Sequence, residues 1–161
     1  MAAKAQKGNA EAGGKVPDFA LATGAGTEVS RAGLKGKPFV LYFYPKDNTS
    51  GCTRQACDFT AAAAKFARLG VEVVGVSKDS LASHEKFREK HKLKLTLASD
   101  PDVAAAKAFG VWGEKTLYGR KFMGVERATF LVDAKGTIAE TWRKVKVPGH
   151  VEAVLQATKK L

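Results

Sequence analysis

The sequence contains only two cysteines, Cys52 and Cys57, among 161 residues. This small number excludes the dense disulfide framework of a small secreted domain and a four-cysteine zinc site. Long hydrophobic runs are also lacking, since the strongest, residues 39–44, is far shorter than the roughly 20 apolar residues that span a bilayer. Residues 1–15 contain no apolar segment resembling a secretory signal. We therefore expect a soluble, cytoplasmic protein with no membrane partner.

Acidic residues are comparatively few, because 16 of them face 27 lysines and arginines and leave a net charge of +11. Such an excess is typical of proteins that bind nucleic acid. The basic residues are scattered, however, and the cluster in residues 86–94 is interleaved with Glu85 and Glu89, as on a solvated helix face. We predict no specific nucleic-acid partner, and we interpret the charge as aiding solubility or attraction to acidic partners. A basic nucleic-acid-binding module is kept as an alternative function.

The length predicts one domain, since single domains commonly contain about 100–200 residues. Residues 1–15 show no periodicity and are interpreted as a flexible tail, so the domain is expected to comprise residues 16–161. Residues 39–44 form a continuous aromatic and β-branched run typical of a buried parallel strand. Apolar residues then recur at helical spacing up to Gly70, and residues 71–76 form a second apolar run. This order predicts a strand–helix–strand unit with parallel strands.

Further elements follow the same alternating pattern. We expect a short strand in residues 16–22, a helix capped by Asp79 or Ser80, and a short strand in residues 95–98. Asp100 and Pro101 are expected to open another helix, which Gly110 ends. Residues 128–132 and 137–142 flank a turn and predict an antiparallel hairpin, and a last helix follows Pro148. The prediction is an α/β domain with a central mixed β-sheet flanked by helices.

The most informative segment, residues 45–57, follows the first buried strand at its carboxyl end, where α/β sheets bind ligands. Thr49 or Ser50 is a suitable helix N-cap, which places Cys52 in the first helical turn. Free backbone amides and the helix dipole favour a reactive thiolate there. Alternatively, Cys52 is a small apolar core residue. Position alone does not decide between these two interpretations.

The spacing Pro45-x-x-x-Thr49-x-x-Cys52 resembles the active-site motif of the peroxiredoxins. The longer stretch from residue 42 to Cys57, which includes Cys-Thr-x-Gln-Ala-Cys, is similar to the Q-type peroxiredoxins. That atypical two-cysteine group is also called the bacterioferritin comigratory protein group. The resemblance extends from residue 16 to the final helix. One departure is Ser50, where many members have proline, and it leads us to expect a slightly looser start of the helix.

The resemblance implies a thioredoxin-like fold and reduction of hydrogen peroxide and organic hydroperoxides without a metal or other cofactor. Cys52 would be the peroxidatic nucleophile that becomes a sulfenic acid, and Cys57 would be the resolving thiol. Thr49 would hydrogen-bond the thiolate and the peroxide, and Pro45 would shield the site from water. Arg127 matches the family's active-site arginine, whose guanidinium stabilises the thiolate and orients the peroxide.

Several residues keep a second interpretation. Cys57 is alternatively a buried structural thiol, and Arg127 a surface arginine beside Glu126. Gln55 matches a position where an acidic or amide residue recurs in the family, and it is a candidate for orienting Arg127. The sequence's three histidines, His84, His91 and His150, match no metal-ligand spacing and are interpreted as surface or cap residues. Trp112 and Trp142 are interpreted as packing residues.

A thiol–disulfide oxidoreductase on the same fold is the second alternative function, but it would require a Cys-x-x-Cys motif, whereas four residues separate these cysteines. The family resemblance implies a thioredoxin-type reductant as partner and a monomer, with dimers in some members. If both cysteines lie on one α-helix, their Cα atoms are about 8.6 Å apart on nearly opposite faces. A disulfide needs about 7 Å or less. Either the first turns of the helix unwind on oxidation or Cys57 resolves nothing, and we expect the helix to unwind.

Overall fold

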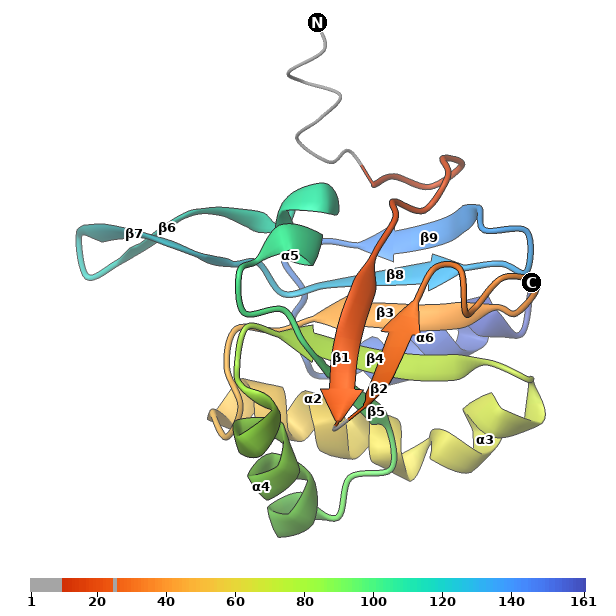
Figure 1. Ribbon diagram of the computed structural model, residues 1–161, viewed down its shortest axis with the longest axis horizontal. Coiled ribbons are helices and arrows are strands. Elements are labelled where there is room, and N and C mark those ends of the chain that lie inside the picture. The colour runs from red at the N-terminus through yellow and green to blue at the C-terminus, as the bar shows by residue number, and fades with distance from the viewer. Residues whose placement is uncertain (1–9, 25) are drawn as a thin grey trace, which may run out of the picture.

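The computed structural model describes residues 10–24 and 26–161 (Figure 1). None of the helices in this part of the chain is both long and apolar enough to cross a membrane. Along the chain the elements are β1 (Ala20–Gly24), β2 (Thr27–Ser30), β3 (Phe39–Phe43), α2 (Ser50–Ala61), α3 (Ala63–Arg68), β4 (Glu72–Ser77), α4 (Leu81–His91), β5 (Thr96–Ser99), α5 (Ala104–Ala108), β6 (Trp112–Leu117), β7 (Arg120–Val125), β8 (Ala128–Val132), β9 (Ile138–Trp142) and α6 (His150–Thr158).

The described residues form one seven-stranded sheet in the order β2-β1-β5-β4-β3-β8-β9. Strand β3 lies inside it, and every one of its residues is buried. It pairs in parallel with β4 and antiparallel with β8, so the sheet is mixed, as predicted. The chain segment α2–α3 connects β3 to β4, which confirms the expected strand–helix–strand unit. The chain therefore passes from the carboxyl end of β3 through one loop to the start of α2.

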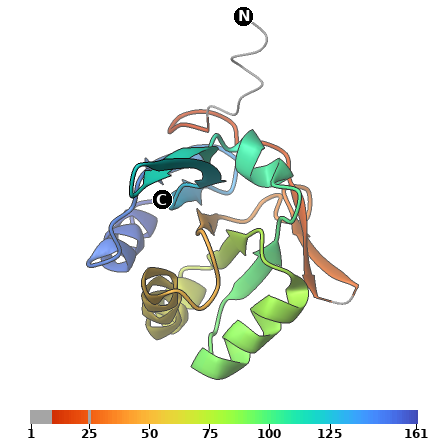
Figure 2. The ribbon, with the colours of Figure 1, turned by 90° about the vertical axis from the view of Figure 1, so that its left-hand side faces the viewer.

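The side chains of β3 alternate between two hydrophobic cores, as the two-residue period of a strand requires. Val40 and Tyr42 belong to the core beneath α2, α3, α4 and α6. Phe39, Leu41 and Phe43 belong to the opposite core, which contains α5 and the N-terminal segment. Figure 2 shows α2, α4 and α6 on one side of the sheet and α5 on the other. The sheet is thus flanked by helices on both faces, with the larger helical layer on the face that carries α2.

The predicted helix boundaries agree with the structure in part. Ser80 caps α4, and its hydroxyl oxygen accepts a hydrogen bond from the Ser83 amide. The helix expected to run up to Gly70 is divided at Ala62 into α2 and α3. Helix α5 begins at Ala104, later than expected, and the Asp100 carboxylate accepts hydrogen bonds from the amides of Ala105 and Ala106 in its first turn. The predicted hairpin at residues 128–142 is confirmed as β8–β9.

The two-stranded sheet β6–β7 was not predicted from the sequence. Its turn consists of Tyr118 and Gly119, both with positive φ, 53° and 76°. Such a turn matches the right-handed twist of a hairpin and usually contains Asn-Gly or Asp-Gly. A tyrosine is rare at the first of these positions, so the segment lacks the usual sequence signal. Figure 1 shows the hairpin projecting from the body of the molecule.

The expected flexible tail covers residues 1–15, of which 1–9 lie outside the described residues. Residues 10–15 differ from that expectation, because they are bound to the sheet. Ala10 is buried, and the Gly13 amide donates a 2.8 Å hydrogen bond to the carbonyl of Ile138, while Lys15 bridges to Thr137. Glycines in this segment allow the backbone to approach the edge of β9 closely. The edge strand is thereby partly covered.

Helix α6 is attached to the sheet through His150, which is buried and not a surface residue as predicted. Its Nε2 lies 2.7 Å from the hydroxyl oxygen of Thr129, which is buried in the middle of β8. Burial and, secondarily, the charge of Arg127 lower the pKa of His150 from 6.5 to about 4. The ring is therefore neutral near pH 7, and its burial carries no charge-desolvation cost there.

This pKa shift predicts a loss of stability in mild acid. Between pH 6.5 and about 4, the unfolded chain binds a proton at His150 that the folded protein does not bind, so the free energy of unfolding falls as the pH falls. From pH 7 to pH 5 we expect this residue to account for about 1–2 kcal/mol. Urea unfolding of the wild type and of His150→Gln at both pH values measures it. Equal losses in the two proteins would contradict the assignment.

Candidate active site

The loop between β3 and α2 is held by hydrogen bonds to the neighbouring strand and its following loop. The amide of Tyr44 donates to the carbonyl of Val76, and the amide of Asp47 donates to Asp79 Oδ2 at 2.8 Å. Asn48 then adopts a left-handed conformation with φ 62°, which turns the chain sharply before the helix. Thr49 is the N-cap residue of α2. Cys52 consequently lies in the first helical turn, as the sequence predicted.

The Asp47 side chain anchors this loop to α4 through a buried polar cluster. Its carboxylate accepts hydrogen bonds from the Tyr44 hydroxyl, from Ser83 Oγ at 2.7 Å and from His84 Nδ1 at 2.7 Å. The other ring nitrogen of His84 lies 3.0 Å from the Ala98 carbonyl oxygen. Both ring nitrogens thus face oxygen atoms, which fixes the orientation of the buried ring. Burial tends to raise the pKa of Asp47, but these hydrogen bonds outweigh it and lower the pKa below its usual value.

The central contact of the site joins Cys52 and Arg127. Arg127 Nη2 lies 3.3 Å from Cys52 Sγ, and Arg127 Nη1 donates a 2.8 Å hydrogen bond to Gln55 Oε1. Cys52 and Gln55 are buried, and Arg127 is half-buried. Gly51 allows the guanidinium to approach, since a Cβ there would lie only 3.1 Å from Nη2. The structure therefore brings Arg127 to the thiol and Gln55 to Arg127, as expected.

Thr49 and Pro45 lie in the same loop without touching the sulfur. The Thr49 hydroxyl donates a 2.8 Å hydrogen bond to the carbonyl of Lys46, and the residue is exposed. Within the described residues, Thr49 makes no hydrogen bond to Cys52. Because its proton is directed to Lys46, the Thr49 oxygen presents lone pairs that can accept a hydrogen bond from a ligand. Pro45 is half-buried and follows the end of β3.

Cys57 lies on α2 and is half-buried, and both thiols are free. Helical geometry places the two Cα atoms about 8.6 Å apart, which is too far for a disulfide. Two buried polar groups near this helix, Tyr42 Oη and Gln55 Nε2, have no hydrogen-bond partner among the described residues. Burial raises the pKa of Tyr42, so its hydroxyl stays protonated. Burying each of these groups without a hydrogen bond costs the folded protein free energy of the order of 1–3 kcal/mol.

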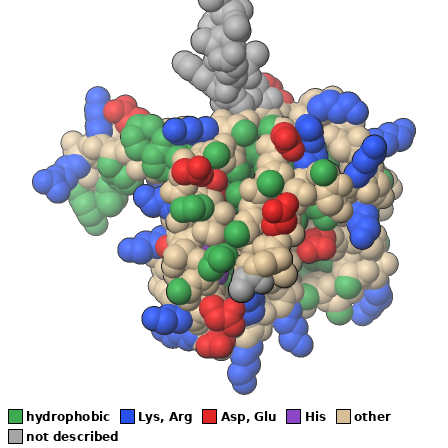
Figure 3. All heavy atoms as spheres, in the orientation of Figure 1, with side chains coloured by type: hydrophobic (Ala, Val, Ile, Leu, Met, Phe, Trp, Pro, Cys, Tyr) green, Lys and Arg blue, Asp and Glu red, His purple; other side chains and the backbone are tan. Residues whose placement is uncertain are grey.

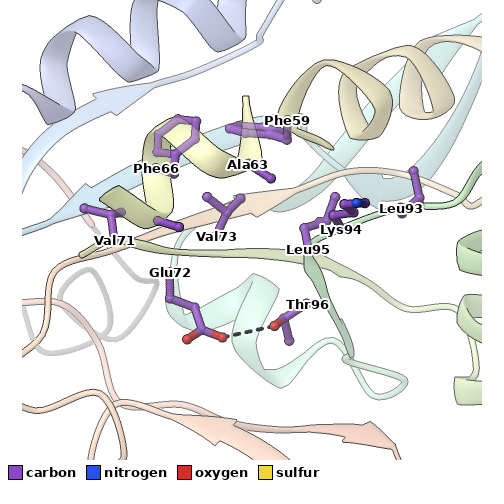
Figure 4. Close-up of a pocket in the computed structure, with 11 residues that line it drawn as sticks. Phe59, Ala63, Phe66, Val71, Glu72, Val73, Leu93, Lys94, Leu95 and Thr96 are labelled. Carbon is purple, nitrogen blue, oxygen red and sulfur yellow. Dashed lines mark hydrogen bonds between the residues drawn. The ribbon is translucent and has the colours of Figure 1, made fainter. Parts of the chain in front are cut away.

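Two hollows in the surface differ in their relation to Cys52. One, of about 460 Å³, is lined by Arg127 together with residues at the base of the β6–β7 hairpin such as Trp112 and Gly124. The other, of about 390 Å³, lies between α2–α3 and the beginnings of β4 and β5 (Figure 4). Phe59 and Phe66 line it, and Figure 4 shows Glu72 hydrogen-bonded to Thr96 at its edge. No residue of the candidate site lines this second hollow.

In the described part of the chain, no group of three or more His, Cys, Asp or Glu residues is arranged to hold a metal ion.

Comparison with known proteins agrees with this geometry. Residues 12–141 match the model of the AhpC/TSA family. The peroxiredoxin Bcp of Bacillus subtilis (strain 168) is 48% identical over 149 residues, covering 92% of this chain and 95% of that protein. The chain belongs to the AhpC/TSA family of peroxiredoxins.

Solved structures of peroxiredoxins have the same fold. A structure of the bacterioferritin comigratory protein of Xanthomonas campestris, described for alkyl peroxide reduction, matches with a TM-score of 0.83 and 42% identity over 88% of this chain and 90% of that one. A variant of PrxQ from Xylella fastidiosa matches with a TM-score of 0.84 and 39% identity over 90% of both chains. These similarities confirm the predicted Q-type group and the thioredoxin-like fold, and peroxiredoxins are peroxidase enzymes.

Sequence reasoning missed the residues that hold the active-site loop of this peroxiredoxin. His84 was interpreted as a surface or cap residue, but it is buried against Asp47. A signal was available, because His84, Phe87 and His91 share one face of α4 at helical spacing. The partner of His84 lies 37 positions earlier in the chain, which no local pattern reveals.

The contact between Gly51 and Arg127 predicts the effect of Gly51→Ala. The new Cβ would force the guanidinium to shift by a few tenths of an ångström, and we expect the second-order rate with peroxide to fall roughly threefold to tenfold. Alanine favours the helix over glycine, so stability should not fall. Stopped-flow measurement of the first reaction with hydrogen peroxide tests this. Ser50→Ala, in the same turn, is the control. Equal rates for Gly51→Ala and the wild type would contradict the prediction.

Proposed function

We propose that Cys52 reduces hydrogen peroxide and organic hydroperoxides as the peroxidatic nucleophile. The observation that carries this assignment is the 3.3 Å contact between Cys52 Sγ and Arg127 Nη2 in the first turn of α2. The guanidinium charge and the helix dipole both favour a thiolate, which is the reactive form of cysteine. Substrate-sized peroxides reach the sulfur at the helix N-terminus, which the exposed Thr49 and half-buried Pro45 border.

The reaction transfers one oxygen atom. The Cys52 thiolate attacks the terminal peroxide oxygen, a sulfur–oxygen bond forms, and the oxygen–oxygen bond breaks. The sulfur is oxidised by two electrons to a sulfenic acid, and the other oxygen leaves as water or an alcohol after taking up a proton. Arg127 stabilises the charge that passes from sulfur to the departing oxygen. Thr49, whose proton is directed to Lys46, accepts the peroxide hydrogen bond and orients the substrate.

Cys57 then resolves the sulfenic acid. The Cys57 thiol gives up its proton and its sulfur attacks Cys52 Sγ, the sulfur–oxygen bond breaks, the hydroxide leaves as water by taking up that proton, and an intramolecular disulfide forms. The intact helix keeps the two cysteines too far apart, so α2 must unwind first. Unwinding is helped by the unpaired Gln55 Nε2 and Tyr42 Oη, because exposing these groups to water removes the cost of burying them unsatisfied.

A dithiol reductant of the thioredoxin type completes the cycle. One of its thiolates attacks the Cys52–Cys57 disulfide, and its second thiol releases it, so the reductant loses two electrons and both cysteines return as thiols. The protein acts as a monomer in this proposal. The predicted functional context is defence against peroxides and maintenance of the cellular thiol balance.

Cysteine variants test the two roles. Cys52→Ser should lose peroxide consumption entirely, because no other described residue is placed to act as the nucleophile beside Arg127. Cys57→Ser should consume about one equivalent of peroxide and then accumulate sulfenic acid. Intact mass spectrometry after one equivalent of peroxide distinguishes these outcomes, since the wild type should lose two hydrogens within one chain. Near-normal turnover by Cys52→Ser would overturn the assignment.

Hydrogen exchange tests the unwinding of α2. In the reduced protein we expect slow amide exchange from about residue 53 onward, and in the disulfide form fast exchange across residues 50–60. The Cys57→Ser sulfenic acid, which cannot form the intramolecular bond, is the matched control and should stay protected. Equal protection in the reduced and disulfide forms, with the disulfide confirmed by mass, would refute the unwinding step.

A further inference from the structure

The β6–β7 hairpin carries most of the large apolar side chains that are exposed in the described part of the chain. Tyr118 is 95% exposed, and Leu117, Met123 and Phe122 are 55%, 53% and 44% exposed. In Figure 3, hydrophobic and basic side chains gather on the hairpin where it projects from the body. Folded proteins rarely expose such clusters, and where they do, the cluster commonly marks an interaction surface.

The strand register divides these residues between the two faces of the hairpin. Lys115 pairs with Phe122, and Leu117 pairs with Arg120, so these four side chains share one face. The Lys115 ammonium already has a hydrogen-bond partner, because its Nζ donates to the Val125 carbonyl at 3.0 Å. Arg120 is exposed and forms no ion pair with any described residue.

The opposite face is mixed, with one apolar, one basic and one acidic side chain beside Thr116. Met123 and Lys121 lie on it, with Glu114 as the hairpin's acidic residue. Lys121 is likewise exposed and without an ion pair among the described residues. We define the hairpin tip as Leu117, Tyr118, Arg120, Lys121, Phe122 and Met123. Its chemistry is that of an apolar contact surface flanked by two free cations.

The hairpin stands beside the candidate active site. The chain passes from the end of β7 at Val125 to Arg127 within two residues, and the hairpin base shares a hollow of about 460 Å³ with Arg127. Figures 1 and 2 show the hairpin extending from the same end of the molecule as the N-terminus of α2. Six-residue strands carry the tip about 20 Å outward from this base.

We propose that the hairpin tip is the docking surface for the protein that reduces the Cys52–Cys57 disulfide. The inference rests on the proposed function, since it concerns the donor of electrons to that disulfide. The partner's attacking sulfur must come within bonding distance of a cysteine in residues 52–57, in line with the disulfide. Even a transient redox interface covers a disc of roughly 14 Å radius around that point. This disc reaches the base of the hairpin, and a folded partner roughly 30 Å across, seated there, extends along the projecting strands to the tip.

The composition of the tip specifies the partner's surface. Leu117 and Phe122 on one face and Tyr118 in the turn require an apolar patch on the partner, away from its dithiol. Arg120 on that face and Lys121 on the opposite face require acidic residues around the patch. The chain's net charge of +11 would attract the same acidic partner at long range. A small reductant such as dithiothreitol needs none of these contacts.

The experiment compares two reductants on the same variants. L117S/F122S removes apolar area, and R120E/K121E reverses the two free charges. We expect each to lower kcat/KM for thioredoxin, supplied with its reductase and NADPH, about tenfold or more. Turnover with dithiothreitol should stay within about twofold of the wild type, because the chemistry is untouched. Raising the salt concentration should slow the wild type more than R120E/K121E.

Matched controls lie at the other end of the molecule. L69S removes an exposed leucine after α3, and K159E/K160E makes the same change of net charge after α6. Neither should alter thioredoxin turnover as the hairpin variants do. Equal losses with both reductants, or equal losses in the controls, would overturn the proposal.

Other occupants of the tip give different results. If sedimentation shows that the wild type is a dimer that L117S/F122S dissociates, with thioredoxin kinetics unchanged, the surface joins two copies of this chain and the proposal is wrong. If the wild type consumes no peroxide even with dithiothreitol, the proposed function itself fails, which is a separate outcome from loss of docking.

Discussion

The contact between Arg127 and Cys52 depends on the register in which β3 and β8 pair. β3 and β8 pair antiparallel with Phe43 opposite Ala128, so the residue before Ala128 lies where β3 ends and the loop to α2 begins. That residue is Arg127, and the loop brings Cys52 to within 3.3 Å of its guanidinium. A slip of one residue would turn every side chain of β8 to the opposite face and remove Arg127 from the thiol. The fully buried residues of both strands fix this register, because any slip would misplace two hydrophobic cores.

The loop between β3 and α2 is anchored by hydrogen bonds to a buried carboxylate. A buried carboxylate is costly unless it is fully hydrogen-bonded, and Asp47 accepts from Tyr44, Ser83 and His84. This cluster connects the loop to α4 and, through the Ala98 carbonyl, to β5. It also maintains the left-handed Asn48, a conformation that few residues adopt without support. The geometry around Cys52 is thus set by residues that never touch the sulfur.

The sequence was sufficient for those parts of the molecule where local pattern and tertiary structure agree. The apolar run before Pro45 could only be a buried strand, and the cap residues around Thr49 placed Cys52 in the first turn of the helix. Two features could not be predicted. The turn of the β6–β7 hairpin places a tyrosine at positive φ, where Asn or Asp is usual. The buried role of His84 depends on an aspartate from a distant segment, so local hydrophobic spacing was not enough to identify it.

The proposed reaction places opposite demands on α2, and Gln55 contributes to both. The helix must be formed for Cys52 to meet Arg127, and it must open for Cys57 to reach Cys52. Gln55 Oε1 accepts a 2.8 Å hydrogen bond from Arg127 and favours the closed helix, whereas its Nε2 is buried with no hydrogen-bond partner among the residues that the structure describes and favours opening. Because one polar atom of Gln55 is hydrogen-bonded and the other is not, this side chain keeps the closed and the open forms of α2 close in free energy. An apolar residue in place of Gln55 would lose the hydrogen bond to Arg127. A side chain with every polar atom hydrogen-bonded would hold the helix closed. The half-satisfied amide therefore suits a helix that has to form and open in each catalytic cycle.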